Sequence, residues 1–307
     1  MSEFDRLVAE IALRQHSVIT STDVGAAGGN RRHVDARLLA GRWKSVYEDV
    51  WRLAGAPWTY EGKVLAAVKA AGPGAVASHL CAARLLDMGF ATALPEISVP
   101  RGRNFRPKGV TVHTSSDLDR CGTEVRKLIP VTDAARTVLD LGRFIKVKAL
   151  LKAIEDGRRL ELLDWHDVVV CLATHARKGR HGITRLREAI AVGALNDGVT
   201  DTDSELVALS LFREYGFPEP TLQHRIFRDD GRIVAEMDFA YIDKKVNFEV
   251  DGTVHLDPVQ RAKDDARDHE LRTVYGWTVR RIPWEIPVHQ PREFVRIVRE
   301  TLASAAH

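Results

Sequence analysis

The chain begins with apolar side chains at helical spacing and then changes to strand-like alternation. Residues 4–15 (FDRLVAEIALRQ) predict an amphipathic helix. Two shorter helices are expected next, one after TSTDV and one capped by Asn30 and ended by Gly41. The segment RWKSVYEDVWRLAG then predicts a two-stranded hairpin. Three short helices followed by a hairpin are typical of a winged helix-turn-helix, which we expect over residues 1–56.

A mixed α/β middle domain is expected over residues 57–197. Its pattern predicts a helix over 60–71, a second helix within GPGAVASHLCAARLLDMGF, and strands at EISVP and GVTVHTS. A further helix is capped by Thr132 or Asp133, and more helices follow to about residue 191. No pattern in this stretch indicates catalytic chemistry.

The polar segment ALNDGVTDTDSE predicts a domain boundary near residue 198. Beyond it the order of expected elements is α-β-β-β-α-β-α, with strands at LQHRIFR, RIVAEMDFAYI, VNFEVD and WTVRRI. Pro258 lies in the first turn of the helix before the last strand. The chain is therefore expected to be an α+β or α/β multidomain protein whose third domain covers residues 198–307.

The strand VNFEVD carries two acids on one face. Side chains alternate along a strand, so Phe248 and its apolar neighbours share one face, whereas Glu249 and Asp251 share the other. Their Cα atoms are expected about 7 Å apart, a spacing at which two carboxylates repel each other unless a cation or water lies between them.

Further acids are expected close to this strand. Asp238 lies on the preceding strand and faces Glu249 if the register allows, and Glu205 comes from the first helix of the domain. Such a set of carboxylates is suited to Mg²⁺ or Mn²⁺, which would activate a water molecule and stabilise a phosphodiester transition state.

Three other side chains are candidates for the same site. His255 follows the acidic strand and is a candidate general base or phosphate contact, with a simple surface role as the alternative. Lys263 and Arg267 lie one helical turn apart and are candidates to clamp a phosphate, the alternative being a solvated, salt-bridged helix face.

Charge is distributed unevenly along the chain, although the net charge is only +3. Residues 201–307 contain 15 Lys and Arg against 20 Asp and Glu, which leaves 30 against 22 for residues 1–200. A basic portion suggests a polyanionic partner such as DNA, and an acidic portion suggests cation binding. The candidate DNA-binding residues, including the basic loop RGRNFRPKG, are Asn30, Arg31, Arg32, His33, Arg37, Lys44, Arg101, Arg103 and Arg106.

Cysteine usage and hydropathy narrow the class of protein. Cys81, Cys121 and Cys171 are far apart and form no CxxC motif, so we expect buried thiols and neither disulfides nor a structural zinc site. No apolar run is long enough to cross a membrane, and the N-terminal residues do not form a signal peptide. The expected location is the cytoplasm, with no membrane partner.

Two resemblances cover nearly the whole chain. Through MDFAYIDKKVNFEVDGTVH and DDARDHELRTVYGWTVRRI, the last hundred residues resemble the very-short-patch-repair-like endonucleases of the PD-(D/E)xK fold. The first two hundred resemble AbiEi-type antitoxins, through HSVITSTDVG, GRWKSVYEDVWRLAG, GPGAVASHLCAARLL and IPVTDAARTVLDLG. The first resemblance implies an αβββαβα restriction-endonuclease-like domain and the second a winged-helix antitoxin region.

The endonuclease resemblance also implies roles for individual residues. Asp238 and Glu249 match its metal-binding acids, and Glu205 matches a helix acid that some members use. Asp251 stands where the wider fold usually has a lysine that orients the attacking water, so Asp251 and His255 would form a variant site. Lys244 or Lys245 is an alternative source of the positive charge.

These observations lead to competing functional hypotheses. The first is a Mg²⁺- or Mn²⁺-dependent DNA endonuclease delivered to duplex by the winged helix. The second is an AbiEi-like antitoxin or autorepressor with an inactive nuclease-like domain, whose partner would be a nucleotidyltransferase-like toxin or a second copy of the chain. RNA processing is a third, because phosphate chemistry does not distinguish the sugar.

Overall fold

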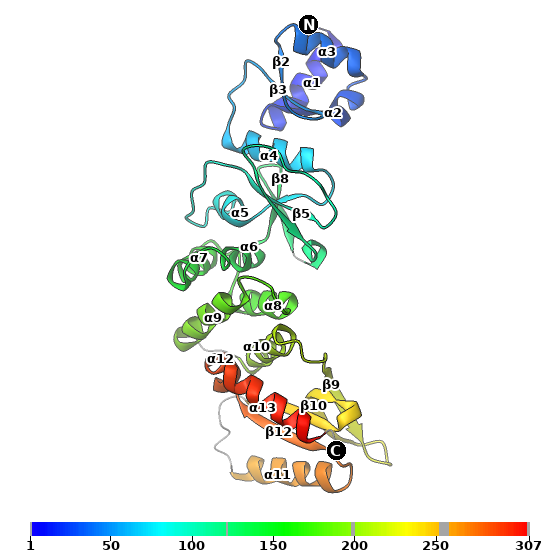
Figure 1. Cartoon of the computed structure of the whole chain (residues 1–307), viewed down its shortest axis with the longest axis vertical. Helices are drawn as coiled ribbons and strands as arrows, with labels where there is room; N and C mark the ends of the chain where they lie inside the picture. The colour runs from blue at the N-terminus through cyan, green and yellow to red at the C-terminus, as the bar shows by residue number, and fades with distance from the viewer. Residues whose placement is uncertain (1, 121, 198–199, 252–257, 306–307) are drawn as a thin grey trace. The chain divides into compact units, whose positions relative to one another are not determined.

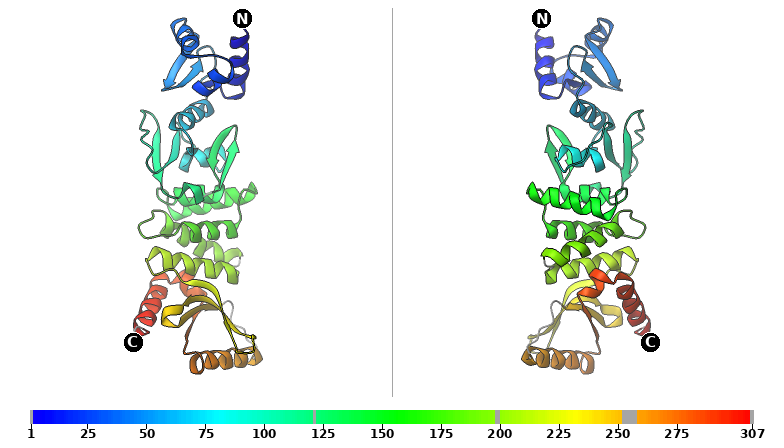
Figure 2. Two further views of the ribbon diagram at one scale, coloured as in Figure 1. Left: turned by 90° about the vertical axis from the view of Figure 1, so that its right-hand side faces the viewer. Right: turned by 90° about the vertical axis from the view of Figure 1, so that its left-hand side faces the viewer.

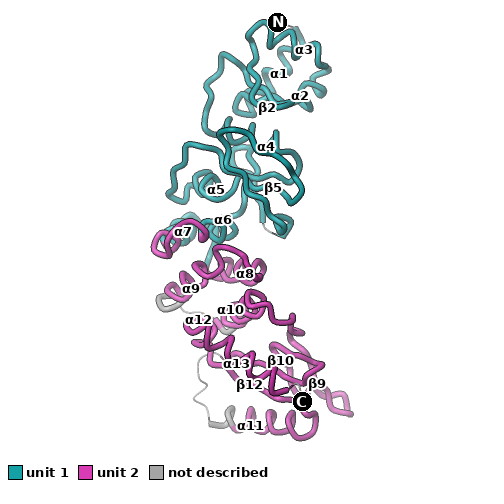
Figure 3. The backbone as a smooth tube through the Cα atoms, viewed as in Figure 1, with its two compact units in different colours: residues 1–141, 152–164 teal, residues 142–151, 165–307 magenta. Residues whose placement is uncertain are grey.

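The structure is a computed structural model of the 307-residue chain (Figure 1). It describes residues 2–120, 122–197, 200–251 and 258–305. These residues form three sheets surrounded by helices, so the chain is a mixed α/β multidomain protein. It divides into two compact units, shown in Figure 3: residues 1–141 with 152–164, and residues 142–151 with 165–307. The domain boundaries expected near residues 57 and 198 stay predictions.

The N-terminal helices and hairpin occur where their pattern predicted them. The elements are α1 (Glu3–Arg14), β1 (Val18–Thr20), α2 (Ser21–Ala26), α3 (Arg31–Leu39), β2 (Trp43–Tyr47) and β3 (Val50–Leu53). Thr20 and Asp23 form a capping box at the start of α2, and Asn30 caps α3. The short strand β1 was not predicted; it pairs with β3 and completes a three-stranded sheet. Its Ile19 packs with Trp43 and Trp51 in a small core.

A five-stranded sheet forms the centre of the next stretch. Its elements are α4 (Tyr60–Ala71), β4 (Val76–Ala77), α5 (His79–Leu85), β5 (Glu96–Pro100), β6 (Thr111–Ser115), β7 (Thr123–Arg126), β8 (Ile129–Thr132) and α6 (Ala134–Leu141). Strands β5 and β6 are parallel. The basic loop over 101–110 is therefore a crossover connection and not a hairpin turn, because parallel neighbours cannot be joined by a tight turn.

Helices connect this sheet to the C-terminal one. They are α7 (Val147–Arg159), α8 (Trp165–His175), α9 (Ile183–Asp197) and α10 (Asp201–Glu214). Thr200 and Asp203 form a capping box at the start of α10. Among the cysteines, Cys81 and Cys171 are buried, as expected, and Cys121 lies outside the described residues. No helix of the described chain is both long enough and apolar enough to cross a membrane.

The C-terminal region contains every element that its pattern predicted, with one short α-helix and the 3-10 helix Ile242–Lys244 in addition. The elements are β9 (Thr221–Phe227), β10 (Ile233–Tyr241), β11 (Val246–Asp251), α11 (Pro258–Thr273), β12 (Thr278–Pro283), α12 (Glu285–His289) and α13 (Pro291–Ser304). The strand order is β12-β11-β10-β9, in which β11 and β12 are parallel and the other pairs antiparallel. Helices α10 and α11 lie on opposite sides of this sheet (Figure 2).

Both faces of the C-terminal sheet are covered. Phe248 and Val250 of β11 pack with Phe212 of α10 and Phe294 of α13. On the other face, Leu271 of α11 packs with apolar residues of β10 and with Trp277. Glu249, on the acidic face of β11, is consequently buried, whereas the side chain of Asp251 at the end of the same strand is 46% exposed.

A buried arginine holds α6 against the end of β6. Arg136 is 2% exposed, and its guanidinium contacts Asp140 at 3.0 Å and Asp117 at 3.4 Å. Replacing Arg136 by Met is expected to lower the free energy of unfolding by about 3 kcal/mol, because two buried carboxylates lose their cation. Urea denaturation followed by circular dichroism measures the change. Arg6→Met removes an exposed pair with Glu10 and should change stability by less than about 1 kcal/mol; equal losses in the two variants would contradict this prediction.

Candidate active site

Strand pairing brings the predicted acids together. Phe239 pairs with Phe248 across β10 and β11, and the charge of Asp238, the residue before Phe239, is close enough to Glu249 to raise its pKa. Glu205 of α10 is close enough for its charge to raise the pKa of Asp238. Residues from one helix and two strands therefore meet in one place, as the sequence predicted.

Asp238 lies at an irregularity in β10. Met237 packs on the α11 side of the sheet and Phe239 packs against Phe212 on the other, although residues two apart share a face in a regular strand. Opposite this point, Gln223 of β9 has a positive φ of 51°. The Asp238 carboxylate accepts a hydrogen bond from the Val250 N–H at 3.3 Å and so satisfies a backbone donor of β11. Irregularities of this kind are frequent next to active sites.

Glu249 is 6% exposed and has a partner for each carboxylate oxygen. The Asn247 side-chain amide donates to Oε1 at 3.0 Å. Oε2 lies 2.9 Å from Nη2 of Arg281 and 3.3 Å from Nη2 of Arg267. The charge of Glu249 is thus compensated within the protein by cations from β12 and α11.

Arg281 and Asp268 belong to this site, although the sequence analysis did not identify them. Arg281 is the parallel-strand partner of Glu249, and it also contacts Asp251 at 2.9 Å and Asp268 at 2.8 Å. The sequence pattern that could have indicated Arg281 is the alternation of side chains along WTVRRI, which puts Arg281 on the face opposite to its neighbours Arg280 and Ile282. It could be used only after β12 was known to pair with β11 in this register.

Burial strongly perturbs the two predicted metal ligands. Desolvation, followed by the charge of Glu205, raises the pKa of Asp238 to about 6. Desolvation also raises the pKa of Glu249 to about 7, because its effect outweighs the opposing charges of Arg281 and Arg267. A bound cation would favour the ionised form of both groups.

The remaining candidates of the C-terminal region differ in position. Lys263 is exposed on α11. Arg267 points to Glu249 and Asp264, so its guanidinium is used within the site and is not held out for a phosphate. Lys245 donates to the Tyr275 carbonyl at 2.9 Å, so it is directed away from the acids. His255 lies outside the described residues.

Helix α3 uses several of its predicted DNA-contacting residues internally. Asn30 caps the helix, and His33 closes the capping box and contacts the Phe4 ring. The prediction that Arg37 contacts DNA is wrong, because Arg37 is 8% exposed and pairs with Asp5 at 2.9 Å. Its helical position turns it toward α1, because four residues after His33 is one turn later on the same side.

Other basic residues of this unit face solvent. Arg31 is exposed, and its guanidinium lies 3.2 Å from Asp35 and 3.7 Å from Asp49. Arg32 and Lys44 are exposed.

The basic loop over 101–110 lies beside the hairpin. Phe105 of the loop contacts Tyr47 of β2 edge-on, with ring centroids 5.7 Å apart. Arg106 donates to the Phe105 carbonyl at 2.8 Å, and Arg101 and Arg103 are exposed. Exposed cations from the hairpin and the loop therefore occur in one neighbourhood.

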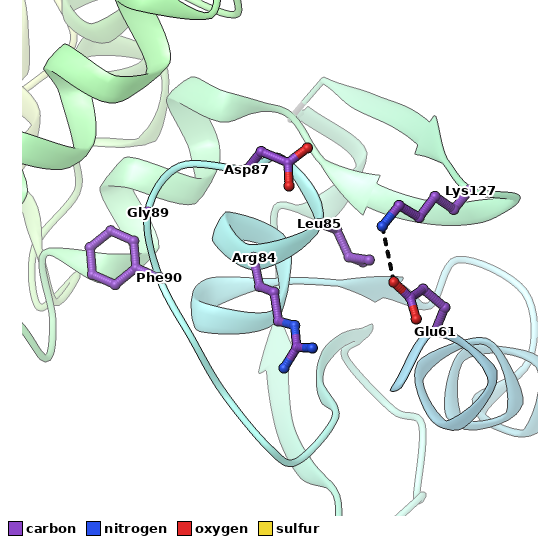
Figure 4. A pocket seen from close by; sticks show the side chains of 7 residues that line it. All are labelled: Glu61, Arg84, Leu85, Asp87, Gly89, Phe90 and Lys127. Carbon is purple, nitrogen blue, oxygen red and sulfur yellow. Dashed lines mark hydrogen bonds and ion pairs between the residues drawn. The ribbon is translucent and has the colours of Figure 1, made fainter. Parts of the chain in front are cut away.

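A separate pocket of about 360 Å³ lies in the first unit (Figure 4). Glu61 and Lys127 form an ion pair of 2.9 Å at its wall. Arg84 and Asp87 also line it, so the pocket has two positive and two negative side chains and no net charge that would favour a ligand of one sign.

Comparison with known proteins adds little to this geometry. No protein-family model matches the chain, and no curated protein matches it. Among solved structures, it is similar to one described as the crystal structure of RV2827C protein from Mycobacterium tuberculosis, with 13% identity and a TM-score of 0.44. That match covers 74% of this chain and 89% of the other. A similarity of this size supports no argument about function.

Because the pKa of Asp238 is raised, we expect Asp238→Asn to increase the free energy of unfolding of the chelator-treated protein in a pH-dependent way. The folded state holds the proton more tightly than the unfolded state, so the wild-type carboxyl destabilises the fold as pH rises from about 4 through about 6. We expect the variant to equal wild type at pH 4 and to be more stable by about 1–2 kcal/mol at pH 7.5. Urea denaturation across this range measures the difference. Asp243→Asn, at an exposed turn, is the control; parallel curves for all three proteins would contradict the prediction.

Proposed function

We propose that the protein is a metal-dependent endonuclease that hydrolyses phosphodiester bonds in DNA. The observation that carries this proposal is the meeting of Asp238 and Glu249 on adjacent strands with Glu205 of α10, where the Glu249 side chain is buried and Asp238 is partly buried. The strand order and the acids are consistent with the PD-(D/E)xK fold that the sequence resembles.

Mg²⁺ or Mn²⁺ fits this donor set, because the ligands are carboxylate oxygens. Asp238 and Glu249 would hold the ion, with Glu205 near Asp238 as a further acid. The described acids do not form a group of three whose ligand atoms lie within 4.8 Å of one another. A Mg²⁺ site does not need three such ligands, because Mg²⁺ usually binds through one or two carboxylates and keeps several waters. When bound, the ion would activate water and offset the charge that develops on the phosphate.

Arg281 is our candidate for the positive charge that the wider fold takes from a lysine. The sequence has Asp251 at the lysine position, and the Arg281 guanidinium contacts both Asp251 and Glu249. A guanidinium does not lose its proton, so Arg281 would orient or neutralise a phosphate oxygen and would not act as a base.

DNA would be recruited by the N-terminal region, which we propose to be a winged helix-turn-helix. The order of three helices and a hairpin supports this, as do the exposed cations Arg31, Arg32 and Lys44. The loop with Arg101, Arg103 and Arg106 would extend the contact to the phosphate backbone.

One observation favours a second candidate, a DNA-binding antitoxin or autorepressor without nuclease activity. Arg281 and Arg267 already compensate Glu249, so the acid cluster can be stable without a metal ion. In this case the C-terminal region would bind a partner, either a nucleotidyltransferase-like toxin or a second copy of the chain.

Cleavage assays separate these candidates. We expect Mg²⁺- or Mn²⁺-dependent cutting within a panel of plasmid, mismatched, branched and single-stranded DNA and structured RNA. Asp238→Asn and Glu249→Gln should each reduce the rate by about a thousandfold, because several kcal/mol of charge stabilisation are lost. Both variants should bind duplex as well as wild type. If none of the three proteins cuts any substrate, with or without metal ion, while all bind duplex equally, the regulator is favoured. Cutting of RNA alone would overturn the DNA assignment.

DNA binding can be tested with two arginines of the same helix. Arg32→Ala should weaken duplex binding and reduce the slope of log affinity against log salt by about 1, because one phosphate contact is lost. Arg37→Met should chiefly lower stability, because it leaves Asp5 without its 2.9 Å partner. Fluorescence anisotropy over a range of salt concentrations measures both slopes. An unchanged slope for Arg32→Ala would remove this helix from the proposed interface.

A further inference from the structure

A second group of metal-ligating side chains belongs to the first unit, whereas the acids described above belong to the second. Among the described residues, His79, Glu96 and His113 each offer a ligand atom, and these atoms all lie within 4.8 Å of one another. They come from three elements, because His79 begins α5, Glu96 begins β5 and His113 lies on β6. His79 is 6% exposed, and the side chains of Glu96 and His113 are 13% and 17% exposed.

The three side chains contact one another directly. His113 Nε2 lies 2.8 Å from Glu96 Oε1, and the two imidazole rings stack with centroids 3.7 Å apart and planes inclined by 23°. The other oxygen of Glu96 accepts the Leu80 N–H at 3.1 Å, which fixes the carboxylate at the start of α5.

Surrounding groups also orient His79. Its Nδ1 lies 2.9 Å from Ser78 Oγ, which accepts a hydrogen bond from Ser98 at 2.8 Å. When Nδ1 donates to Ser78, the lone pair is on Nε2, an arrangement typical of metal-bound histidines. His79 also has a positive φ of 54°, a conformation that is costly for most non-glycine residues and that His, Asn and Asp adopt more readily.

We propose that His79, Glu96 and His113 bind a divalent transition-metal ion of the Zn²⁺ class. Two imidazoles and one carboxylate suit Zn²⁺, whereas Mg²⁺ prefers oxygen ligands alone. The ion would join α5, β5 and β6, and with three protein ligands its fourth position would be taken by a water molecule. It is chemically distinct from the Mg²⁺ or Mn²⁺ proposed for the acids of the C-terminal sheet.

The rearrangement needed for binding is small but specific. Zn–N and Zn–O bonds of about 2.0 Å at a tetrahedral angle put the two ligand atoms about 3.3 Å apart, so the 2.8 Å contact between His113 and Glu96 must widen. His113 would then carry its proton on Nδ1. The rings must also splay from their stacked arrangement, because a nitrogen lone pair lies in the plane of its ring.

The test uses the full chain carrying Asp238→Asn and Glu249→Gln, which removes the other proposed metal ligands. After chelator treatment, Co²⁺ serves as a spectroscopic probe and Zn²⁺ as its competitor. We expect one Co²⁺ per chain with tetrahedral visible absorption, displacement by Zn²⁺ but not by Mg²⁺, and a rise in melting temperature of about 5 °C at saturation.

Variants of the cluster decide the assignment. Glu96→Gln keeps the shape of the side chain, and His79→Asn introduces a residue that tolerates positive φ, so both should fold. Each, like His113→Asn, should weaken Co²⁺ binding by about 100-fold or more, whereas the exposed His289→Asn should not. Melting temperatures of the metal-free proteins establish that a variant is folded before it is titrated. No stoichiometric binding by the parent protein, or equal binding by folded cluster variants, would overturn the proposal.

Discussion

The burial of Glu249 in the middle of β11 is the constraint on which the C-terminal sheet depends. A carboxylate that is 6% exposed must be matched by hydrogen bonds and opposite charge, or its burial costs several kcal/mol. Asn247 supplies the hydrogen bond from the same strand, and Arg267 and Arg281 supply the charge from α11 and β12. The requirement of one side chain therefore fixes how a helix and a neighbouring strand are attached to β11.

The same arrangement would limit the cost of binding a cation at Glu249. Arg281 is shared between Glu249, Asp251 and Asp268, and its Nε and Nη2 both donate to Asp268. If an ion took the Glu249 oxygen, Arg281 would keep Asp268 as a partner and would not become an isolated buried charge. Replacing Arg281 by an ion at Glu249 would thus cost less free energy than breaking a buried ion pair usually does, because neither charge would be left without a partner.

The local sequence pattern was sufficient to predict most helices and strands, but not to predict which other elements they pack against or pair with. Asn30 and the apolar stripe of residues 4–15 identified helix ends and faces because capping and periodicity are local properties. Asp238 was assigned to the acids because hairpin-connected strands are adjacent. Arg281 was missed because the parallel pairing of β11 with β12 joins segments separated by a whole helix, and its register is not encoded in either strand alone. Arg37 was misjudged because helical position alone does not say which side another helix covers.

The irregularity at Asp238 connects these points to chemistry. A regular β10 would keep Met237 and Phe239 on one face and would satisfy the Val250 N–H through a backbone carbonyl. The strand instead changes face here, and one oxygen of the Asp238 carboxylate takes the place of that carbonyl. The hydrogen bond fixes the carboxylate in position beside Glu249. A side chain has taken the place of a ladder bond where the acids meet, so the irregularity of β10 and the position of this carboxylate are parts of one local structure.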